Sequence, residues 1–327
     1  MVDDFAVESM YEVFAAAPKD GPKRYRIDCY TTHMTGNGEP IELLKLFPWS
    51  AKKMIELQKD QEELFNRFRG LGVKLEFTNP PKGLGKYVPV FGRNHLKNSG
   101  VGERVFYVRG FNDDGLTAGS VDFAVKFTGE AAARLKAGFE SIDTDEGNSD
   151  YEVEIDQQTR LIVDRGVPGQ SMIYDILLEN MQQSLSSIKG MSALVPDGRG
   201  AKALAAAQTR GSSVEVFVSP AIQSNPAHPF SFGNMLWMAE KANYFNMQRN
   251  GVSFPVFRNQ IRGAHGKCWI FDGKTAIFGT HNASEKGVKA GTCEAAIITT
   301  NQKIIQGLQN VFSQTKLESY PDIKGVI

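Results

Sequence analysis

Two stretches of the chain carry the same sparse pattern of polar residues, and this repeat constrains the fold more than any other feature. In each copy a His is followed by a Lys two positions later and by an Asn seventeen positions later. The first copy contains His95, Lys97, Gly110 and Asn112, and the second contains His265, Lys267, Asp272, Thr280 and Asn282. A register that is used twice predicts one site built from two similar halves.

The length of 327 residues fits two domains of ordinary size. The best boundary is the acidic segment Asp143–Asp150, which contains Gly and Ser and has no large hydrophobe. We therefore expect an N-terminal domain over residues 1–150 and a C-terminal domain over residues 151–327.

The charge balance bears on which molecule the protein binds. Lys+Arg and Asp+Glu both total 37, whereas proteins that bind nucleic-acid backbone usually carry a basic excess, so nucleic acid is the less favoured partner.

The sequence also bears on where the protein acts. No apolar run approaches the roughly 18 residues of a membrane span, and residues 1–4 lack the basic and apolar regions of a signal peptide. We expect a cytoplasmic protein. Apolar segments could add peripheral membrane contact or belong to the core; they are Phe47–Trp49, Phe230–Phe232 and Met235–Met238. The sequence leaves the oligomeric state open.

Strand-like and helix-like segments alternate along the chain, which predicts an α/β fold with a parallel or mixed sheet flanked by helices. The expected helices are Ser50–Phe68, Ser171–Ser187, Gly200–Thr209 and Asn234–Arg249. The expected strands are Tyr25–Tyr30, Val73–Phe77, Arg104–Arg109, Ser120–Thr128, Met191–Val195, Val214–Val218, Gly251–Phe257, Lys267–Asp272 and Thr275–Phe278.

The repeated residues suit the chemistry of a phosphodiester. His265 and Lys267 are two positions apart, so in an extended chain their side chains point to the same face. Two imidazoles, two ammonium groups and two carboxamides around one point suit a tetrahedral anion. One imidazole attacks phosphorus to give a phosphohistidine, and the other protonates the leaving alcohol and then activates the incoming nucleophile. The lysines neutralise the charge, so no metal and no cofactor is needed.

This pattern resembles the signature of the phospholipase D superfamily, and the resemblance covers most of residues 20–315. The signature is His-x-Lys, four residues, Asp, six residues, then Gly-(Gly/Ser/Thr)-x-Asn, and the second copy, His265 to Asn282, matches it at every fixed position. The first copy departs from it, with Gly102 at the Asp position and Arg109 at the first Gly position. The segment around Asp122 is nevertheless similar to the one that follows the first motif in cardiolipin synthases.

The resemblance implies two similar phospholipase D-like lobes with the active site at their interface. It implies that His95 is the nucleophile and His265 the general acid and base. Glu294, twelve residues past Asn282, stands where the family carries an acid that supports an active-site His. The carboxylate that orients each His is therefore expected downstream, with Asp122 and Glu294 as candidates. Asp272 is either part of the catalytic set or mainly shapes its own turn.

The expected activity is phospholipid hydrolysis or phosphatidyl transfer, since the neutral charge and the likeness to cardiolipin synthases favour a phospholipid over another phosphodiester. Two alternatives stay open. One is a metal-independent nuclease of the same superfamily, and the other is a catalytically impaired protein that binds phosphate without turnover.

Overall fold

A computed structural model of the chain describes residues 23–28, 65–78, 94–110, 121–144, 149–218, 256–258, 264–314 and 318–319, with a few single residues besides. Asn112 lies outside these residues, as do the apolar segments at 47–49, 230–232 and 235–238 and the expected helix Asn234–Arg249, apart from single helical residues. Within the part of the chain that the structure describes, no helix combines the length and the apolar character that crossing a membrane requires.

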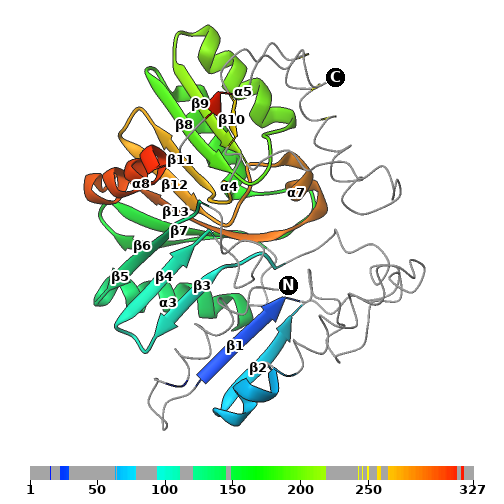
Figure 1. Cartoon of the computed structure of the whole chain (residues 1–327), viewed down its shortest axis with the longest axis vertical. Coiled ribbons are helices and arrows are strands. Elements are labelled where there is room, and N and C mark those ends of the chain that lie inside the picture. The colour runs from blue at the N-terminus through cyan, green and yellow to red at the C-terminus, as the bar shows by residue number, and fades with distance from the viewer. Residues whose placement is uncertain are drawn as a thin grey trace, which may run out of the picture.

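A nine-stranded mixed sheet forms the centre of the C-terminal half (Figure 1). Its order is β14-β10-β9-β8-β11-β12-β13-β7-β6; the neighbours β8, β9 and β10 run parallel, and all other pairs are antiparallel. The strands are β6 (Tyr151–Asp156), β7 (Thr159–Arg165), β8 (Ser187–Ser192), β9 (Ser213–Val218), β10 (Val256–Arg258), β11 (Cys268–Phe271), β12 (Thr275–Gly279), β13 (Cys293–Thr299) and β14 (Glu318–Ser319). The mixed α/β fold predicted from the alternating segments is confirmed.

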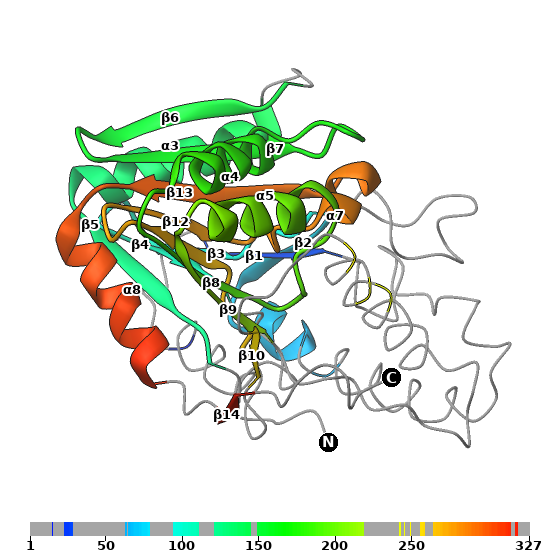
Figure 2. The ribbon, with the colours of Figure 1, turned by 90° about the horizontal axis from the view of Figure 1, so that it is seen from above.

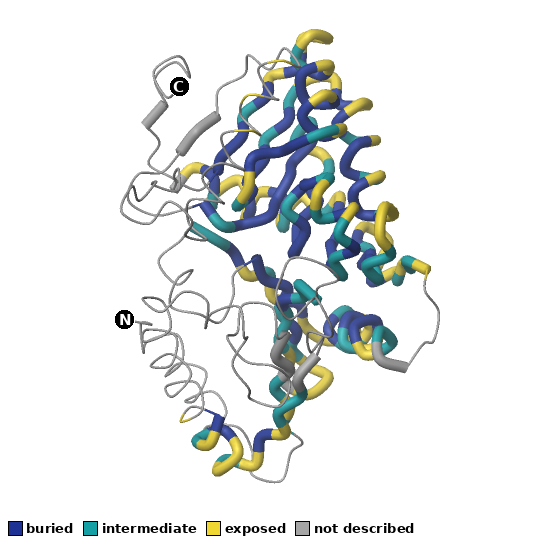
Figure 3. The backbone as a smooth tube through the Cα atoms, turned by 90° about the vertical axis from the view of Figure 1, so that its right-hand side faces the viewer, coloured by how far each residue is buried: buried dark blue, intermediate teal, exposed yellow. Residues whose placement is uncertain are grey.

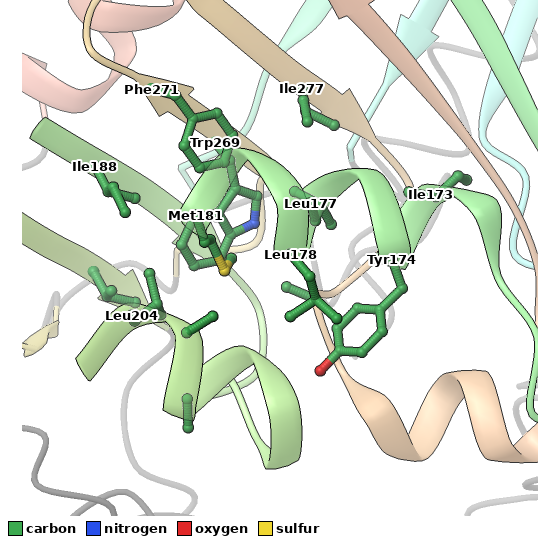
Figure 4. Packing of buried hydrophobic residues seen from close by; sticks show 14 of the residues in the cluster. Ile173, Tyr174, Leu177, Leu178, Met181, Ile188, Leu204, Trp269, Phe271 and Ile277 are labelled. Carbon is green, nitrogen blue, oxygen red and sulfur yellow. The ribbon is translucent and has the colours of Figure 1, made fainter. Parts of the chain in front are cut away.

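One face of this sheet is covered by α4 (Met172–Gln183) and α5 (Gly198–Thr209), which lie next to each other in Figure 2. Because successive strand residues point to opposite faces, Trp269 and Phe271 of β11 join the helices in one core cluster. Figure 4 shows these two rings beside Leu177 and Met181 of α4. Gly190 of β8 leaves room for the indole, since a Cβ there would lie 2.2 Å from the Trp269 ring.

The other face packs against the N-terminal half. Cys268 and Ile270 of β11 belong to a second cluster together with α8 (Gln302–Gln314), α3 (Glu130–Thr144) and the strands β4 (Val105–Arg109) and β5 (Ala124–Thr128). Within this cluster the rings of Phe106 and Phe139 stack with centroids 5.3 Å apart. Figure 3 colours the residues by burial, and long stretches of the described chain are buried. The two halves therefore share one hydrophobic core.

The N-terminal half repeats the elements of the C-terminal half in register. A three-stranded antiparallel sheet contains β3 (Asn98–Val101), β4 and β5. The bounds of β3 and β4 lie 170 positions before those of β11 and β12, the same offset that separates His95 from His265. The helix α3 begins 172 positions before α8. A separate parallel pair, β1 (Lys23–Asp28) with β2 (Val73–Thr78), is the counterpart of the parallel pair β8 and β9. This repeat fits the expected two lobes, and the domain division at residue 150 stays a prediction.

Several expected boundaries were wrong. The helix that starts at the Ser171 cap ends at Gln183, and β8 starts at Ser187, four residues before the expected strand. The reason is a tight loop over residues 184–187 that a distant carboxylate holds, as described below. The expected strand Ser120–Thr128 is shorter, and the helix α3 and the hairpin of β6 and β7 were not expected at all. Of the expected helix Ser50–Phe68, the structure describes only residues 63 and 65–68, all helical, and the helix continues to residue 70.

Candidate active site

The two motif copies meet where short backbone bridges join the halves. The amide of His95 donates to the carbonyl of Cys293 at 2.8 Å, and the amide of His265 donates to the carbonyl of Val121 at 2.9 Å. Each bridge places a histidine beside the residue that follows its acceptor, which is an acid in both cases. The pairing is therefore crossed: each half supplies the carboxylate for the histidine of the other half.

The second-copy histidine is paired with the first-half acid. Nδ1 of His265 lies 2.8 Å from Oδ2 of Asp122, while Oδ1 of Asp122 accepts from the amide of Phe123 at 2.8 Å. Burial lowers the pKa of His265 below 6.5, and the hydrogen bond from Asp122 acts in the opposite direction. With Nδ1–H donated to Asp122, Nε2 is left for other partners. The side chain stays 15% exposed, so the imidazole edge is accessible.

The first-copy histidine is paired with the second-half acid in the same way. Nδ1 of His95 lies 3.0 Å from both carboxylate oxygens of Glu294 and 3.1 Å from the carbonyl of Thr280. Burial, followed by the charge of Lys97, lowers the pKa of His95 well below 6.5. When Nδ1–H is donated to the ionised Glu294, the lone pair of Nε2 is free to act as a nucleophile.

The carboxylate of Glu294 is only 5% exposed, and burial raises its pKa to about 7. His281, Lys97, the hydroxyl of Thr280 and Lys267 act in the opposite direction. Since burial disfavours the charged forms of both Glu294 and His95, this pair takes up an additional proton as the pH falls through about 7. We therefore expect the form with an ionised Glu294 above that pH.

The two motif lysines are buried beside their histidines. Lys97 is 7% exposed and Lys267 is 1% exposed, and the Nζ atom of each donates to the backbone carbonyl of its own histidine, at 3.0 and 2.6 Å. Lys267 also donates to the carbonyl of Gly110 in the other half at 3.2 Å and lies 3.0 Å from Nε2 of His265. Two ammonium groups beside the two histidines suit the binding of an anion between the halves.

The carboxamide of Asn282 is the remaining polar group of the second motif. Its Oδ1 atom is buried and has no hydrogen-bond partner among the described residues. Its backbone carbonyl accepts from the Ser192 hydroxyl at 2.9 Å, which ties the motif to the end of β8.

Asp272 lies apart from the paired histidines, at the other end of β11. Its carboxylate accepts five hydrogen bonds from the loop before β8: the hydroxyls of Ser184 and Ser186 and the amides of Leu185, Ser186 and Ser187. Burial acts to raise the pKa of Asp272, but these hydrogen bonds outweigh it and hold the pKa well below 3.8. Asp272 follows His265 by seven positions, which in an extended chain corresponds to roughly 20 Å. The geometry favours the turn-shaping role over the catalytic one.

Two residues contact the site that the motif analysis did not single out for a role. Thr280 donates its hydroxyl to Glu294, and His281 is buried, with Nδ1 accepting from the amide of Ala283 at 3.0 Å. The only signal for either was its position inside the second motif. Among the described residues, no group of three or more His, Cys, Asp or Glu is arranged to hold a metal ion.

Comparison with known proteins agrees with this architecture. Residues 177–316 match the family model of the phospholipase D-like domain of cardiolipin synthase. The crystal structure of phosphatidylserine synthase from Haemophilus influenzae Rd KW20 is similar over 99% of this chain and 87% of that chain, with a TM-score of 0.63 and 11% identity. Nuc from Salmonella typhimurium, a phospholipase D family member, is similar over 50% of this chain and 100% of its own, with a TM-score of 0.37 and 18% identity. No curated protein sequence matches the chain. The predicted resemblance to the phospholipase D superfamily is confirmed by the family model for residues 177–316, and the similarity to phosphatidylserine synthase confirms the fold over the rest of the chain.

Proposed function

We propose that this chain, which has the fold of the phospholipase D superfamily, cleaves or exchanges phosphodiesters through a phosphohistidine intermediate. One observation carries the proposal: the structure pairs each motif histidine with a carboxylate from the opposite half and places a buried lysine beside it. Such a pair fixes Nδ1 and leaves Nε2 for chemistry on the substrate.

The first step forms a bond between Nε2 of His95 and phosphorus. As this bond forms, the bond from phosphorus to the leaving alcohol breaks, and His265 gives its Nε2 proton to that oxygen. Lys97 and Lys267 stabilise the charge on the non-bridging oxygens. Burial and the charges of Lys267 and Lys97 lower the pKa of His265. The negative charge of a bound phosphodiester offsets the lysines, which favours the protonated form that this step requires.

The second step returns the protein to its starting state. Nε2 of His265 takes the proton of water or of a second alcohol while the oxygen of that nucleophile attacks phosphorus. The bond from phosphorus to His95 then breaks, and His95 regains its lone pair. Water gives hydrolysis, and an alcohol gives phosphatidyl transfer.

A phospholipid is the substrate that the observations favour. The net charge of zero offers no overall attraction to a polyanion, and the family model that matches residues 177–316 is that of cardiolipin synthase. The lipid-contacting surface and the place of the protein in the cell stay predictions.

The proposal is tested by incubating the protein with phospholipid vesicles, with a soluble diester reporter and with single-stranded DNA, all in the presence of a chelator. We expect cleavage of the lipid and the reporter. Cleavage of DNA alone would replace the lipid assignment with the nuclease, and no cleavage of any diester would refute the function.

The intermediate tests the roles of the two histidines. After a diester with labelled phosphorus and a leaving group that departs without a proton, such as p-nitrophenolate, is added and the reaction is quenched, His265→Gln should accumulate an acid-labile, base-stable adduct, because His95 can then attack without the acid and the second step lacks its base. His95→Gln should form none. The matched control Lys289→Gln changes a side chain that is 71% exposed and should behave like the unchanged protein. An adduct in His95→Gln that is missing in His265→Gln would reverse the assignment.

A further inference from the structure

The two histidine–acid pairs differ at the motif position that faces the acid. In the first half this position is Gly110, and 170 positions later in the second half it is Thr280. The Thr280 hydroxyl donates to Oε2 of Glu294, and its oxygen accepts from the amide of Ala295 at 3.0 Å. The hydroxyl has one proton, and Glu294 is the nearer of its two acceptors, since the carbonyl of Ala295 lies 3.3 Å away.

Gly110 leaves the space that the shorter acid occupies. A Cβ at this position would lie 2.1 Å from Oδ1 of Asp122, far inside contact distance. Glu294 has one methylene more than Asp122, and in that half a threonine side chain stands where the glycine leaves a gap. Each half therefore combines an acid with a neighbour that fits its length: a short acid with glycine, and a long acid with a hydroxyl.

We propose that Thr280 is a positioning residue for His95 that acts through Glu294, and that the pairs Gly110–Asp122 and Thr280–Glu294 are not interchangeable between the halves. The inference rests on the proposed function, since it assigns Glu294 the task of orienting the nucleophile. Thr280 contacts both members of this pair. Its hydroxyl donates to Glu294, and its backbone carbonyl lies 3.1 Å from Nδ1 of His95.

Neighbouring groups shift the pKa of Glu294 in opposite directions, so a single hydrogen bond to its carboxylate can change its ionisation. His95, Lys97, Lys267 and His281 face the carboxylate from the two motifs. From the strands, Asp164 lies opposite Glu294 in the register of β7 and β13, and Cys293 precedes it. Burial and Asp164 disfavour the ionised carboxylate, whereas His281, Lys97 and Lys267 favour it. A hydrogen bond from the Thr280 hydroxyl is stronger to the ionised carboxylate than to the protonated acid, so it favours the ionised form of Glu294.

The first test compares Thr280→Val, which keeps the shape and loses the hydroxyl, with Thr280→Ser, which keeps the hydroxyl. In Thr280→Val the acidic limb of the pH profile of kcat/KM for the diester reporter should move to higher pH by about one unit, because one hydrogen bond to a charged acceptor is lost. In Thr280→Ser the limb should stay where it is. Equal profiles for the two variants would overturn the proposal.

The second test exchanges the pair. Glu294→Asp alone withdraws the carboxylate from His95 and should lower kcat at least tenfold. Adding Thr280→Gly recreates the combination of the first half and should recover part of that loss. A double variant that is no more active than Glu294→Asp would refute the pairing.

A readout without turnover separates this inference from the proposed function. In protein labelled with nitrogen-15 in histidine, the chemical shift of Nδ1 is followed as the pH is changed. The pH midpoint of the His95 signal should change in Thr280→Val and not in Thr280→Ser. The midpoint of the His265 signal should stay unchanged in both variants. If the unchanged protein cleaves no diester, the function fails, and this spectrum still decides whether Thr280 positions His95. An unmoved His95 signal in Thr280→Val would refute the positioning role even in an active enzyme.

Discussion

Replacing Asp272 tests whether this motif acid shapes a turn or takes part in catalysis. Its carboxylate accepts three amides and two hydroxyls from residues 184–187 and thereby sets the end of α4 and the start of β8. The residue has φ of 52°, in the left-handed region that Asn and Gly tolerate better than Ala. Asp272→Asn, Asp272→Gly and Asp272→Ala therefore separate the loss of hydrogen bonds from the backbone cost.

The magnitudes follow from the contacts. In Asp272→Asn one side-chain oxygen remains, and we expect it to keep about two of the five hydrogen bonds. Losing the other three should lower the free energy of unfolding by about 2 kcal/mol. The loss is modest because the amides of the exposed Leu185 and Ser186 can bind water instead. Asp272→Ala loses all five bonds and adds about 1 kcal/mol for the left-handed backbone, about 4 kcal/mol together. Asp272→Gly avoids the backbone term and should fall between the two.

The assay is urea unfolding at pH 7 combined with the diester reporter. Each variant should lower the urea midpoint without changing the m-value, and kcat of the folded fraction should stay within a few fold of the unchanged protein. The pKa of Asp272 is held low in the folded state, so its contribution is present above the ordinary pKa of 3.8 and is lost as the pH falls through the folded value. The reasoning would be refuted if Asp272→Asn kept its stability within 0.5 kcal/mol, taken as roughly the usual effect of a surface change, and yet lost turnover.

Further predictions concern the buried residues around the site. Gly279→Ala places a Cβ 2.2 Å from the carbonyl of Ala295, so we expect a loss of at least about 2 kcal/mol in urea unfolding; an unchanged midpoint would contradict the packing. Burial raises the pKa of Asp164 from 3.8 to about 7, so its protonated form favours folding below pH 4 and this contribution is lost as the pH rises through 7. Asp164→Asn should therefore unfold at higher urea than the parent at pH 8 and not at pH 4, and the same shift at both values would count against it. Asp122→Asn and Glu294→Gln should each lower kcat by roughly 100-fold or more with folding intact, as expected when the orienter of a catalytic imidazole is lost; near-normal rates would exclude the crossed pairs from catalysis.

The crossed pairing makes both histidine–acid pairs depend on the packing of the two halves. The hydrogen bonds from His265 to Asp122 and from His95 to Glu294 span 143 and 199 residues of sequence, and both lie at bridges between the halves. Neither half alone holds a histidine together with its acid. The shared core of β4, β5, α3, β11 and α8 therefore positions the two histidine–acid pairs as well as stabilising the fold.

The sequence by itself predicted the features that repeat locally along the chain. The spacing of His and Lys by two residues places both on one face of an extended segment, and this holds in either half because it depends only on strand geometry. The continuous apolar run of residues 268–271 identified a buried strand for the same reason. The equal register of the two copies predicted similar halves, and β3 and β4 do repeat as β11 and β12.

The tertiary structure alone decided which partners these residues meet. Asp122 and Glu294 were both candidates to orient a histidine, but only the packing of the halves assigns each to the histidine of the other half. Asp272 matched its motif position, yet the five donors that define its role come from a loop at least 85 residues earlier. Local spacing follows from chain geometry, whereas contacts between distant segments follow from how the shared core packs, and a linear pattern does not encode that choice.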